Sequence, residues 1–327
     1  MKNIAFLGVG GVGGYFGGKM TQLLYDNDPG INIFFIARGE HLKAIKENGL
    51  TLKTKTEGIL KCIPTFATDN CEELPKLDIC FICVKQYALE DAVKKILPKL
   101  DTNTKIVPLL NGIDIYDRIR KITDKGIIFP ACVYVGTHIE SYGIVEQNGG
   151  ACTITFGQDP NHKYIDAEDI CELFNKAKIK FEWSSEYIEA IWSKYMFIAA
   201  YGLVTASENK TLGEVLDNEE SSKKVKGIMK EIESISKAEN IRLPNNIVDS
   251  SYLMAKNFPY ETKTSFQRDY ELKDKLDERV LFGQTIIDLG TKYGIDTTVA
   301  KSVYQELNKM DQENSINRRK AEFEYTV

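Results

Sequence analysis

The chain has 327 residues, of which 43% are hydrophobic and 27% are charged, and its formal net charge is −5. This is the composition of an ordinary globular protein, and the negative charge gives no general attraction to nucleic acid or to an anionic membrane. No apolar stretch approaches the roughly 18 residues of a membrane span. We therefore expect neither nucleic acid nor a membrane as partner. Because the N-terminal sequence does not resemble a signal peptide, we expect a cytoplasmic protein.

A glycine-rich motif follows the first apolar run. Ile4–Leu7 predicts a short buried strand, Gly8–Gly14 reads GVGGVGG, and Tyr15–Tyr25 has the pattern of a helix. The G-x-G-x-x-G motif between a strand and a helix is typical of dinucleotide binding, because its glycines allow a tight turn, close approach of the pyrophosphate and close helix packing. The alternative is a glycine-rich turn without a ligand. The residues predicted to hold the pyrophosphate are Gly8, Val9, Gly10, Gly11, Val12 and Gly13.

The second predicted strand, Ile31–Ala37, ends at Arg38. In NAD-binding units an acidic residue near this position binds the ribose 2′-hydroxyl, whereas an arginine can bind the 2′-phosphate of NADP. Glu40 keeps an NAD interpretation open, and an arginine that merely begins a surface loop is a further alternative. The arginine favours NADP, with NADPH as its reduced form.

Two later predicted strands also end in polar residues. Leu77–Val84 is followed by Lys85, and Lys105–Leu110 is followed by Asn111. Pro108 weakens the second strand prediction, because proline cannot donate to a sheet ladder. In an open parallel sheet, ligands bind outside the carboxyl ends of the strands. We therefore expect Lys85 and Asn111 to share the edge that carries the glycine motif and the arginine.

The rest of the chain divides into two parts. Residues 127–183 predict short strands, with turns at Tyr142-Gly143 and Asn148-Gly149-Gly150 and one helix over Asp166–Ala177. Only helices are predicted beyond that point. They cover Tyr187–Tyr201, Glu219–Asn240, Ile247–Lys256, Asp269–Tyr293 and Val299–Leu307. We therefore expect an α/β domain with a mostly parallel sheet at residues 1–182 and an all-α domain at residues 183–327.

The cysteines do not form a metal-binding pattern. Cys80-Phe81-Ile82-Cys83 has C-x-x-C spacing but lies inside a predicted apolar strand, and no second Cys or His pair is spaced to complete a metal site. The chain has seven cysteines and three histidines. Buried free thiols and no metal are therefore the expectation.

One lysine lies on the apolar stripe of a predicted helix. Tyr187, Ile191, Lys194 and Ile198 recur at helical spacing, so Lys194 shares its face with apolar side chains. An apolar environment disfavours a charged ammonium, which suits a proton donor. The spacing leaves open the alternative of a lysine whose ammonium reaches the surface.

These motifs together resemble the ketopantoate reductase (2-dehydropantoate 2-reductase) family over essentially the whole chain. The matching segments are Gly8–Gly14, Arg38-Gly39, Val84-Lys85, Leu110-Asn111-Gly112, Trp192-Ser193-Lys194, Leu203–Ala206 and Thr264–Asp269. The resemblance implies an N-terminal Rossmann-type domain and a helical C-terminal domain. It also implies transfer of a hydride from NADPH to a small-molecule 2-oxo acid, namely reduction of 2-dehydropantoate to (R)-pantoate in pantothenate and coenzyme A biosynthesis.

By position, the resemblance also implies roles along the cofactor. Arg38 would bind the 2′-phosphate, while Lys85 and Asn111 would lie along the cofactor towards the nicotinamide. The family's glutamate aligns with Asp277, which is therefore counted among the cofactor-binding residues. Its neighbour Glu278 could serve instead.

The resemblance implies a second set of roles at the substrate. Lys194 would be the catalytic residue, because it would protonate the ketone oxygen as the hydride reaches the carbon. Ser265 would hydrogen-bond the substrate carboxylate, and Asn111 would also lie at the substrate. The enzyme would be a monomer or a homodimer.

Three positions depart from the family pattern. Ile198, Gly202 and Leu212 stand where asparagines that hold the substrate are expected. A pocket that has lost amides offers fewer hydrogen bonds to a hydroxylated substrate. Two alternatives therefore stay open: a family member that reduces a different, more apolar 2-oxo acid, and a non-catalytic NADP-binding sensor.

Overall fold

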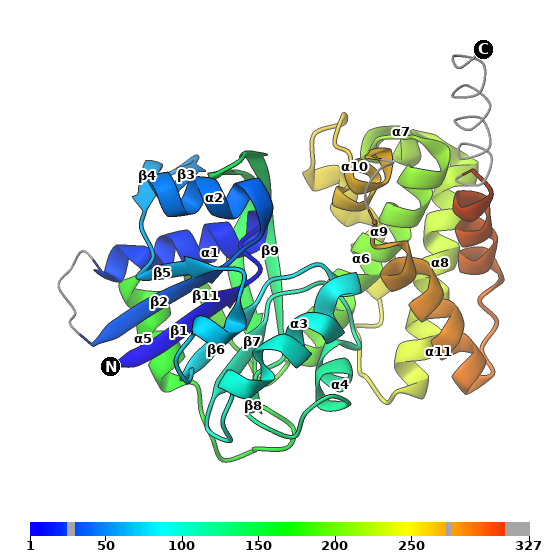
Figure 1. The fold of residues 1–327 in the computed structure, drawn as a ribbon. Helices are drawn as coiled ribbons and strands as arrows, with labels where there is room; N and C mark the ends of the chain where they lie inside the picture. The colour runs from blue at the N-terminus through cyan, green and yellow to red at the C-terminus, as the bar shows by residue number, and fades with distance from the viewer. Residues whose placement is uncertain (25–29, 273–275, 311–327) are drawn as a thin grey trace, which may run out of the picture. The chain divides into compact units, whose positions relative to one another are not determined.

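The computed structural model describes residues 1–24, 30–272 and 276–310. The chain forms two compact units, Met1–Ile191 and Trp192–Val327, whose elements are labelled in Figure 1. The first contains every strand assigned to a sheet, and the second is helical in its described part. The predicted class, an α/β part with a mostly parallel sheet followed by a helical part, is confirmed.

The first unit is built around a six-stranded sheet with strand order β5-β2-β1-β6-β7-β8. Every pairing in it is parallel. Its strands are β1 (Lys2–Leu7), β2 (Ile31–Ile36), β5 (Phe66–Thr68), β6 (Ile79–Ile82), β7 (Lys105–Pro108) and β8 (Ile127–Ile128). Pro108 is the last residue of β7 and lies beyond the part that β8 pairs, so its missing N–H interrupts no ladder there.

Both faces of this sheet are buried, which explains why its central strands are continuous apolar runs. Side chains alternate, so Phe6 and Phe81 enter one core and Leu7 and Ile82 the other. The helices α3 (Leu89–Ile96) and α4 (Ile115–Arg120) contribute to the second core. The first core receives α1 (Gly11–Thr21), α2 (Gly39–Asn48) and α5 (Glu168–Lys176). Short 3₁₀ turns connect these elements at η1 (Gln22–Leu24), η2 (Cys71–Glu73), η3 (Gln86–Ala88) and η4 (Leu97–Lys99).

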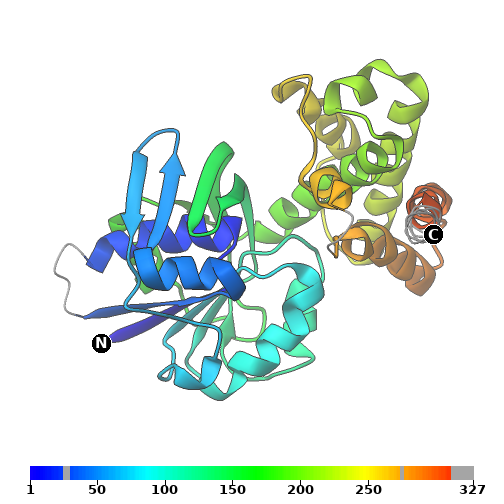
Figure 2. The same cartoon turned by 45° about the horizontal axis from the view of Figure 1, so that its top comes forward.

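A second, five-stranded sheet has the order β11-β10-β3-β4, with β9 paired to β10. Its strands are β3 (Leu50–Thr54), β4 (Gly58–Cys62), β9 (Ala131–Ser141), β10 (Ile144–Phe156) and β11 (Lys180–Trp183). Figure 2 draws the β3–β4 hairpin in light blue and the β9–β10 hairpin in green. The predicted turn at Tyr142-Gly143 is confirmed as the link between β9 and β10.

The predicted turn at Asn148-Gly149-Gly150 is wrong. These residues lie inside β10, whose pairing with β9 continues on both sides of them with register shifts next to Gly149. Glycine and asparagine there make β-bulges and not a chain reversal, because a bulge also needs the conformational freedom that signals a turn.

Helix α1 lies between the two sheets. It begins at Gly11 and not at the predicted Tyr15, while Tyr25, the predicted end, lies outside the described residues. It contacts β1 and β2 of the parallel sheet and β3, β4, β9 and β10 of the other. Glycines permit this close approach: a Cβ on Gly13 would lie 2.2 Å from the carbonyl oxygen of Gly8, and one on Gly14 would lie 2.7 Å from a Val145 methyl.

The second unit contains most of α6 (Tyr187–Glu208), which begins in the first unit, and a set of further helices. These are α7 (Leu212–Asp217), α8 (Glu219–Ala238), α9 (Ile247–Leu253), η5 (Met254–Asn257), α10 (Ser265–Glu271), the π-helical turn η6 (Val280–Gln284), α11 (Thr285–Tyr293) and a helix over 298–310. Within the described ranges no helix combines the length and apolar character that a membrane crossing needs.

The single helix predicted over Asp269–Tyr293 is wrong. α10 ends at Glu271, and a π-helical turn precedes α11. Residues 273–275 of that prediction lie outside the described residues. Just before the π-helical turn, the Asp277 carboxylate accepts the backbone N–H of Arg279 at 2.9 Å. Local side-chain bonds of this kind compete with the backbone bonds of a continuous helix.

Candidate functional site

The polar residues predicted at strand ends lie on one edge of the parallel sheet. β2, β1, β6 and β7 are consecutive neighbours and run parallel, so their carboxyl ends meet at the same edge. Arg38, Gly8, Lys85 and Asn111 follow these four strands in that order. The prediction that they share an edge is therefore confirmed.

The glycine loop is held to the end of β2. The N–H groups of Gly8 and Val9 both donate to the carbonyl of Ile36 at 3.0 Å. Gly8 has φ +99°, and a Cβ on it would lie 2.9 Å from the backbone nitrogen of Val84, so only glycine suits this position. By contrast, no atom lies within 4 Å of the Cβ position of Gly10. The loop therefore packs tightly at its first glycine and is open at its second.

The first turn of α1 suits an anion. Gly10 supplies no side-chain cap to it, and the turn has no acidic residue. The first N–H groups of a helix lack intrahelical partners and carry the positive end of its dipole. A phosphate is the kind of ligand that this arrangement binds.

Arg38 extends from the loop after β2 into solvent. It is exposed, and its guanidinium makes no hydrogen bond or ion pair with any residue the structure describes. Glu40, the residue that would indicate NAD, faces Lys43 at 3.9 Å, and both of these side chains are 65% exposed. The arginine thus has the freedom to bind an anionic ligand.

His41, which the sequence reasoning did not single out, lies beside this loop. It is 7% exposed, and its Nδ1 accepts the N–H of Gly143 at 3.0 Å. Burial lowers the pKa of His41, and the nearby backbone of Val9 opposes this effect. It therefore holds the turn of the β9–β10 hairpin, and no local sequence signal identifies such a residue.

The C-x-x-C segment belongs to the core. Cys80 is completely buried in β6, and burial raises the pKa of its thiol to about 12. All seven cysteines are free. Across the described ranges no three His, Cys, Asp or Glu side chains come together as a metal-binding group.

Lys194 lies within the helical unit on α6 and is 7% exposed. The helical spacing placed Lys194 on an apolar face and left burial and a surface-reaching ammonium as alternatives, and the structure has the residue buried. The next residue, Tyr195, is 1% exposed, and its hydroxyl donates to the carbonyl of Leu281 at 2.6 Å. Because Leu281 lies in the π-helical turn, this bond fixes α6 to the segment that follows Glu278. Such turns are frequent at functional sites.

Ser265 is exposed at the first position of α10. The preceding residue, Thr264, caps this helix by accepting the N–H of Gln267 at 3.1 Å. The hydroxyl oxygens of Thr264 and Thr205 are 2.9 Å apart, and Thr205 is on α6. The helix that carries Lys194 is therefore joined directly to the start of the helix that carries Ser265.

The positions that lost asparagines have apolar surroundings. A Cβ on Gly202 would lie 3.5 Å from the Cβ of Phe266 and 3.8 Å from the ring of Phe282, so aromatic side chains approach this position. Leu212 is 2% exposed. Ile198, on α6, is partly buried.

The two candidate carboxylates are both largely buried, and the side chain of Asp277 is 7% exposed. The Asp277 carboxylate accepts hydrogen bonds from Nε of Arg279 at 2.9 and 3.1 Å. The guanidinium also donates to Asn308 at 3.1 Å and lies 5.3 Å from the ring of Tyr270. Glu278 is 4% exposed. The Asp277 carboxylate is thus committed to a structural ion pair.

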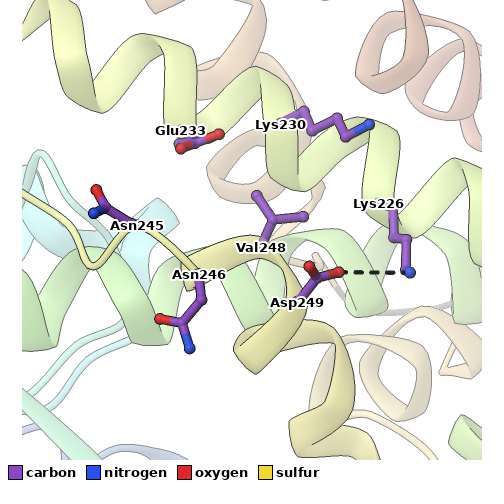
Figure 3. Close-up of a pocket in the computed structure, with 7 residues that line it drawn as sticks. All are labelled: Lys226, Lys230, Glu233, Asn245, Asn246, Val248 and Asp249. Atoms are coloured by element: carbon purple, nitrogen blue, oxygen red, sulfur yellow. Dashed lines mark ion pairs between the residues drawn. The ribbon is translucent and has the colours of Figure 1, made fainter.

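A separate pocket of about 260 Å³ lies on the helical unit between α8 and α9 (Figure 3). Lys226 and Asp249 form an ion pair across it at 3.7 Å. None of the predicted site residues lines it. The lining residues are Lys226, Lys230, Glu233, Asn245, Asn246, Val248 and Asp249.

A glycine loop at the edge of a parallel sheet, followed by a helical unit with a buried lysine, defines the class of a dinucleotide-dependent oxidoreductase. Two family models identify the family: "Ketopantoate reductase PanE/ApbA" matches residues 4–161, and its C-terminal counterpart matches residues 186–311. The chain belongs to the ketopantoate reductase family.

Relatives span the whole chain at low identity. "Uncharacterized oxidoreductase YkpB" of Bacillus subtilis (strain 168) is 22% identical over 307 residues, which are 94% of this chain and 98% of that protein. The crystal structure of 2-dehydropantoate 2-reductase from Porphyromonas gingivalis W83 is 26% identical, with a TM-score of 0.80 over 94% of this chain and 99% of that one. D-mandelate dehydrogenase with NADH and anilino(oxo)acetate has a TM-score of 0.83 at 19% identity, covering 95% and 99% of the two chains. The last similarity establishes the fold alone.

Proposed function

We propose that this protein reduces a 2-oxo acid with NADPH and that 2-dehydropantoate, which would yield (R)-pantoate, is the first candidate substrate. The observation that carries the proposal is the burial of Lys194 on a helix joined through Thr205 to the start of α10. A protein that only senses NADP has no need of a buried proton donor. The solved 2-dehydropantoate 2-reductase of Porphyromonas gingivalis, a relative over nearly its full length, supports the choice of substrate.

In this proposal residues 1–182 hold the cofactor and residues 183–327 the substrate. The first turn of α1 binds the pyrophosphate, because its N–H groups lack intrahelical partners, and the open position of Gly10 lets the ligand approach the glycine loop. Lys85 and Asn111 extend this surface along the same sheet edge. Bound NADPH would supply the hydride.

The chemistry left to the protein is a proton transfer. As the carbonyl carbon is reduced, negative charge develops on its oxygen, which needs a proton and a nearby positive charge. The Lys194 ammonium supplies both. The Ser265 hydroxyl donates a hydrogen bond to the substrate carboxylate and thereby orients the carbonyl.

NADPH is preferred over NADH in this proposal because of Arg38. Its guanidinium is exposed and has no partner among the described residues, whereas Glu40 faces Lys43. A guanidinium binds a phosphate with paired, charge-assisted hydrogen bonds that a 2′-hydroxyl cannot replace.

Glu278, and not Asp277, takes the place of the family's glutamate in this proposal. The carboxylate of Asp277 is bound by Arg279, whereas Glu278 precedes the π-helical turn that Tyr195 holds against α6. Glu278→Gln should therefore reduce turnover, and Asp277→Asn should mainly reduce stability.

A second candidate substrate is a more apolar 2-oxo acid. The observation that favours it is the approach of Phe266 and Phe282 to Gly202, where an amide is expected in the family. An apolar surface offers no hydrogen bond to replace those that a substrate hydroxyl loses when it leaves water. A branched or aromatic 2-oxo acid without this hydroxyl would have a smaller desolvation cost on binding there.

The test is a comparison of kcat/KM over a panel of 2-oxo acids with NADPH and with NADH, followed by cofactor absorbance. The panel contains 2-dehydropantoate, a branched aliphatic 2-oxo acid and an aromatic one. The highest kcat/KM with 2-dehydropantoate would support the first candidate, and a reversed order the second. If the protein reduces none of these 2-oxo acids, the interpretation that remains is a non-catalytic NADP-binding sensor.

A further inference from the structure

Arg118 on α4 joins three elements of the first unit. Its side chain is 17% exposed, and its Nε donates to the Glu90 carboxylate at 2.7 Å. Nη2 donates to the other oxygen of Glu90 at 3.1 Å and to the backbone carbonyl of Gln86 at 2.8 Å. Nη1 donates to the side-chain oxygen of Gln86 at 3.0 Å. One guanidinium therefore binds both the start of α3 and the η3 turn, and Figure 1 draws α3 and α4 side by side.

This contact reaches the proposed cofactor edge through the chain. Gln86 directly follows Lys85, whose carbonyl accepts the N–H of Ala88, the last residue of η3. Because Arg118 holds both the backbone and the side chain of Gln86, it fixes the direction in which the chain leaves β6.

Arg118 also faces the loop after β7. Nη1 lies 4.0 Å from Oδ1 of Asp114, which is three residues beyond Asn111. This oxygen is buried without a hydrogen bond, and burial raises the pKa of the Asp114 carboxyl. Hydrogen bonding to Arg118 lowers the pKa of Glu90. The guanidinium of Arg118 therefore lies between two carboxylates. Glu90 follows the loop that carries Lys85, and Asp114 follows the loop that carries Asn111.

We propose that Arg118 is a positioning residue for the cofactor edge, which sets the loops that carry Lys85 and Asn111. This inference rests on the proposed function, because it assumes that Lys85 contacts NADPH. In this proposal Arg118 acts through its contacts with Gln86 and not by binding cofactor or substrate itself.

The same helix offers a matched control. Arg120 is also a buried arginine with a carboxylate partner, since its side chain is 10% exposed and Nη2 donates to Asp159 at 2.6 Å. Its other contacts are with Tyr116 and with the backbone of residues 124–126, and none is with η3 or α3. Arg120→Ala therefore removes a comparable ion pair that does not lead to Lys85.

The experiment measures NADPH dissociation constants and melting temperatures for the full chain and its Arg118→Ala, Arg118→Lys and Arg120→Ala variants. We expect Arg118→Ala to weaken NADPH binding by about tenfold or more, the equivalent of one lost charge-assisted bond. Arg120→Ala should lower the melting temperature but change NADPH affinity by less than about twofold. Arg118→Lys should fail to restore affinity, because an ammonium cannot hold Glu90 and Gln86 in one fork. If Arg118→Ala does not fold, Glu90→Gln can be compared with Arg120→Ala in its place, because it keeps the side-chain shape. We expect it to lose less NADPH affinity than Arg118→Ala would.

A double-mutant cycle with Lys85→Ala makes the test specific. If Arg118 acts through Lys85, Arg118→Ala should have little further effect in the Lys85→Ala background. Equal affinity losses for Arg118→Ala and Arg120→Ala, or fully additive losses in the cycle, would overturn the positioning role. A parent protein that does not bind NADPH at all would instead overturn the proposed function.

Discussion

The sheet edge and helix α6 present positive charge in opposite ways. At the edge, Arg38 and Lys85 are exposed, and they follow strands whose order alone brings them together. On α6, Lys194 is 7% exposed. An exposed cation costs little to keep charged and suits the binding of an anionic cofactor. A buried ammonium is costly to keep charged, and this is the property that a proton donor uses.

The sharpest test of this contrast is Lys194→Ala. A positioned general acid contributes about 10²–10⁴-fold to rate, so kcat should fall by that order while NADPH affinity changes little. Lys194→Arg should not rescue, because a guanidinium does not give up its proton. Steady-state kinetics on the best 2-oxo acid measures both effects.

Lys230→Ala is the control for that variant, because Lys230 is an exposed lysine in the same unit beside the pocket of Figure 3. It should leave kcat unchanged. A Lys194→Ala enzyme that keeps kcat within a few-fold of the parent would remove the catalytic assignment.

Two glycine variants separate packing from binding at the sheet edge. A Cβ on Gly13 meets the Gly8 carbonyl at 2.2 Å, so Gly13→Ala should destabilise the fold by about 3 kcal/mol, as overpacking does. Gly10→Ala meets nothing within 4 Å and should fold normally, but its methyl should obstruct the pyrophosphate and weaken NADPH at least about tenfold. Urea denaturation and a binding titration measure the pair. Normal NADPH binding by Gly10→Ala would show that the loop does not hold the pyrophosphate.

Arg38→Ala tests whether the exposed charge selects the cofactor. Loss of a charge-assisted contact costs about 1.5–3 kcal/mol, so NADPH affinity should fall roughly ten- to a hundredfold. NADH affinity should change little, because NADH has no 2′-phosphate. Binding titrations with both cofactors measure the difference. Equal weakening of the two would mean that Arg38 is not the discriminator.

The smallest expected effect is a pH dependence from His41. Burial lowers its pKa from the ordinary value of 6.5, so the unfolded chain takes up a proton before the folded chain does. Its contribution to stability is therefore present above about pH 6.5 and is lost as the pH falls through the folded-state pKa, because the protonated Nδ1 can no longer accept the Gly143 N–H. Urea denaturation at a series of pH values measures this loss. His41→Gln should flatten it, and an unchanged profile in that variant would assign the dependence to other groups.

The sheet edge was predictable because its signals are local. A continuous apolar run predicts a buried parallel strand, and the polar residue after each run then falls on the edge. Helix α1 shows the limit of such signals, since glycines are poor helix formers and Gly11 to Gly14 did not indicate a helix start. Packing between two sheets overrides that propensity, and no local pattern reports it.

The helical unit was predicted less completely. Thr211 and Glu214 form a capping box at the start of α7, a recognisable signature of a helix that was nonetheless missed. The break after α10 had no comparable signal, because no glycine or proline stands between Glu271 and the π-helical turn that begins at Val280. Arg118 could not be identified either, since its partners lie 28 and 32 residues earlier in the chain.

The position of α1 between the sheets has a consequence for how the protein folds. The glycine loop is synthesised before its packing partners, because Gly11 packs against Thr137 and Gly14 against Val145, both more than a hundred residues later. Contacts of such long sequence separation form late, because a long loop must close before they are gained. The nascent chain therefore cannot complete the packing around its glycine loop until the β9–β10 hairpin has left the ribosome, and a ligand that needs the packed loop can assist only the last stage of folding of this unit.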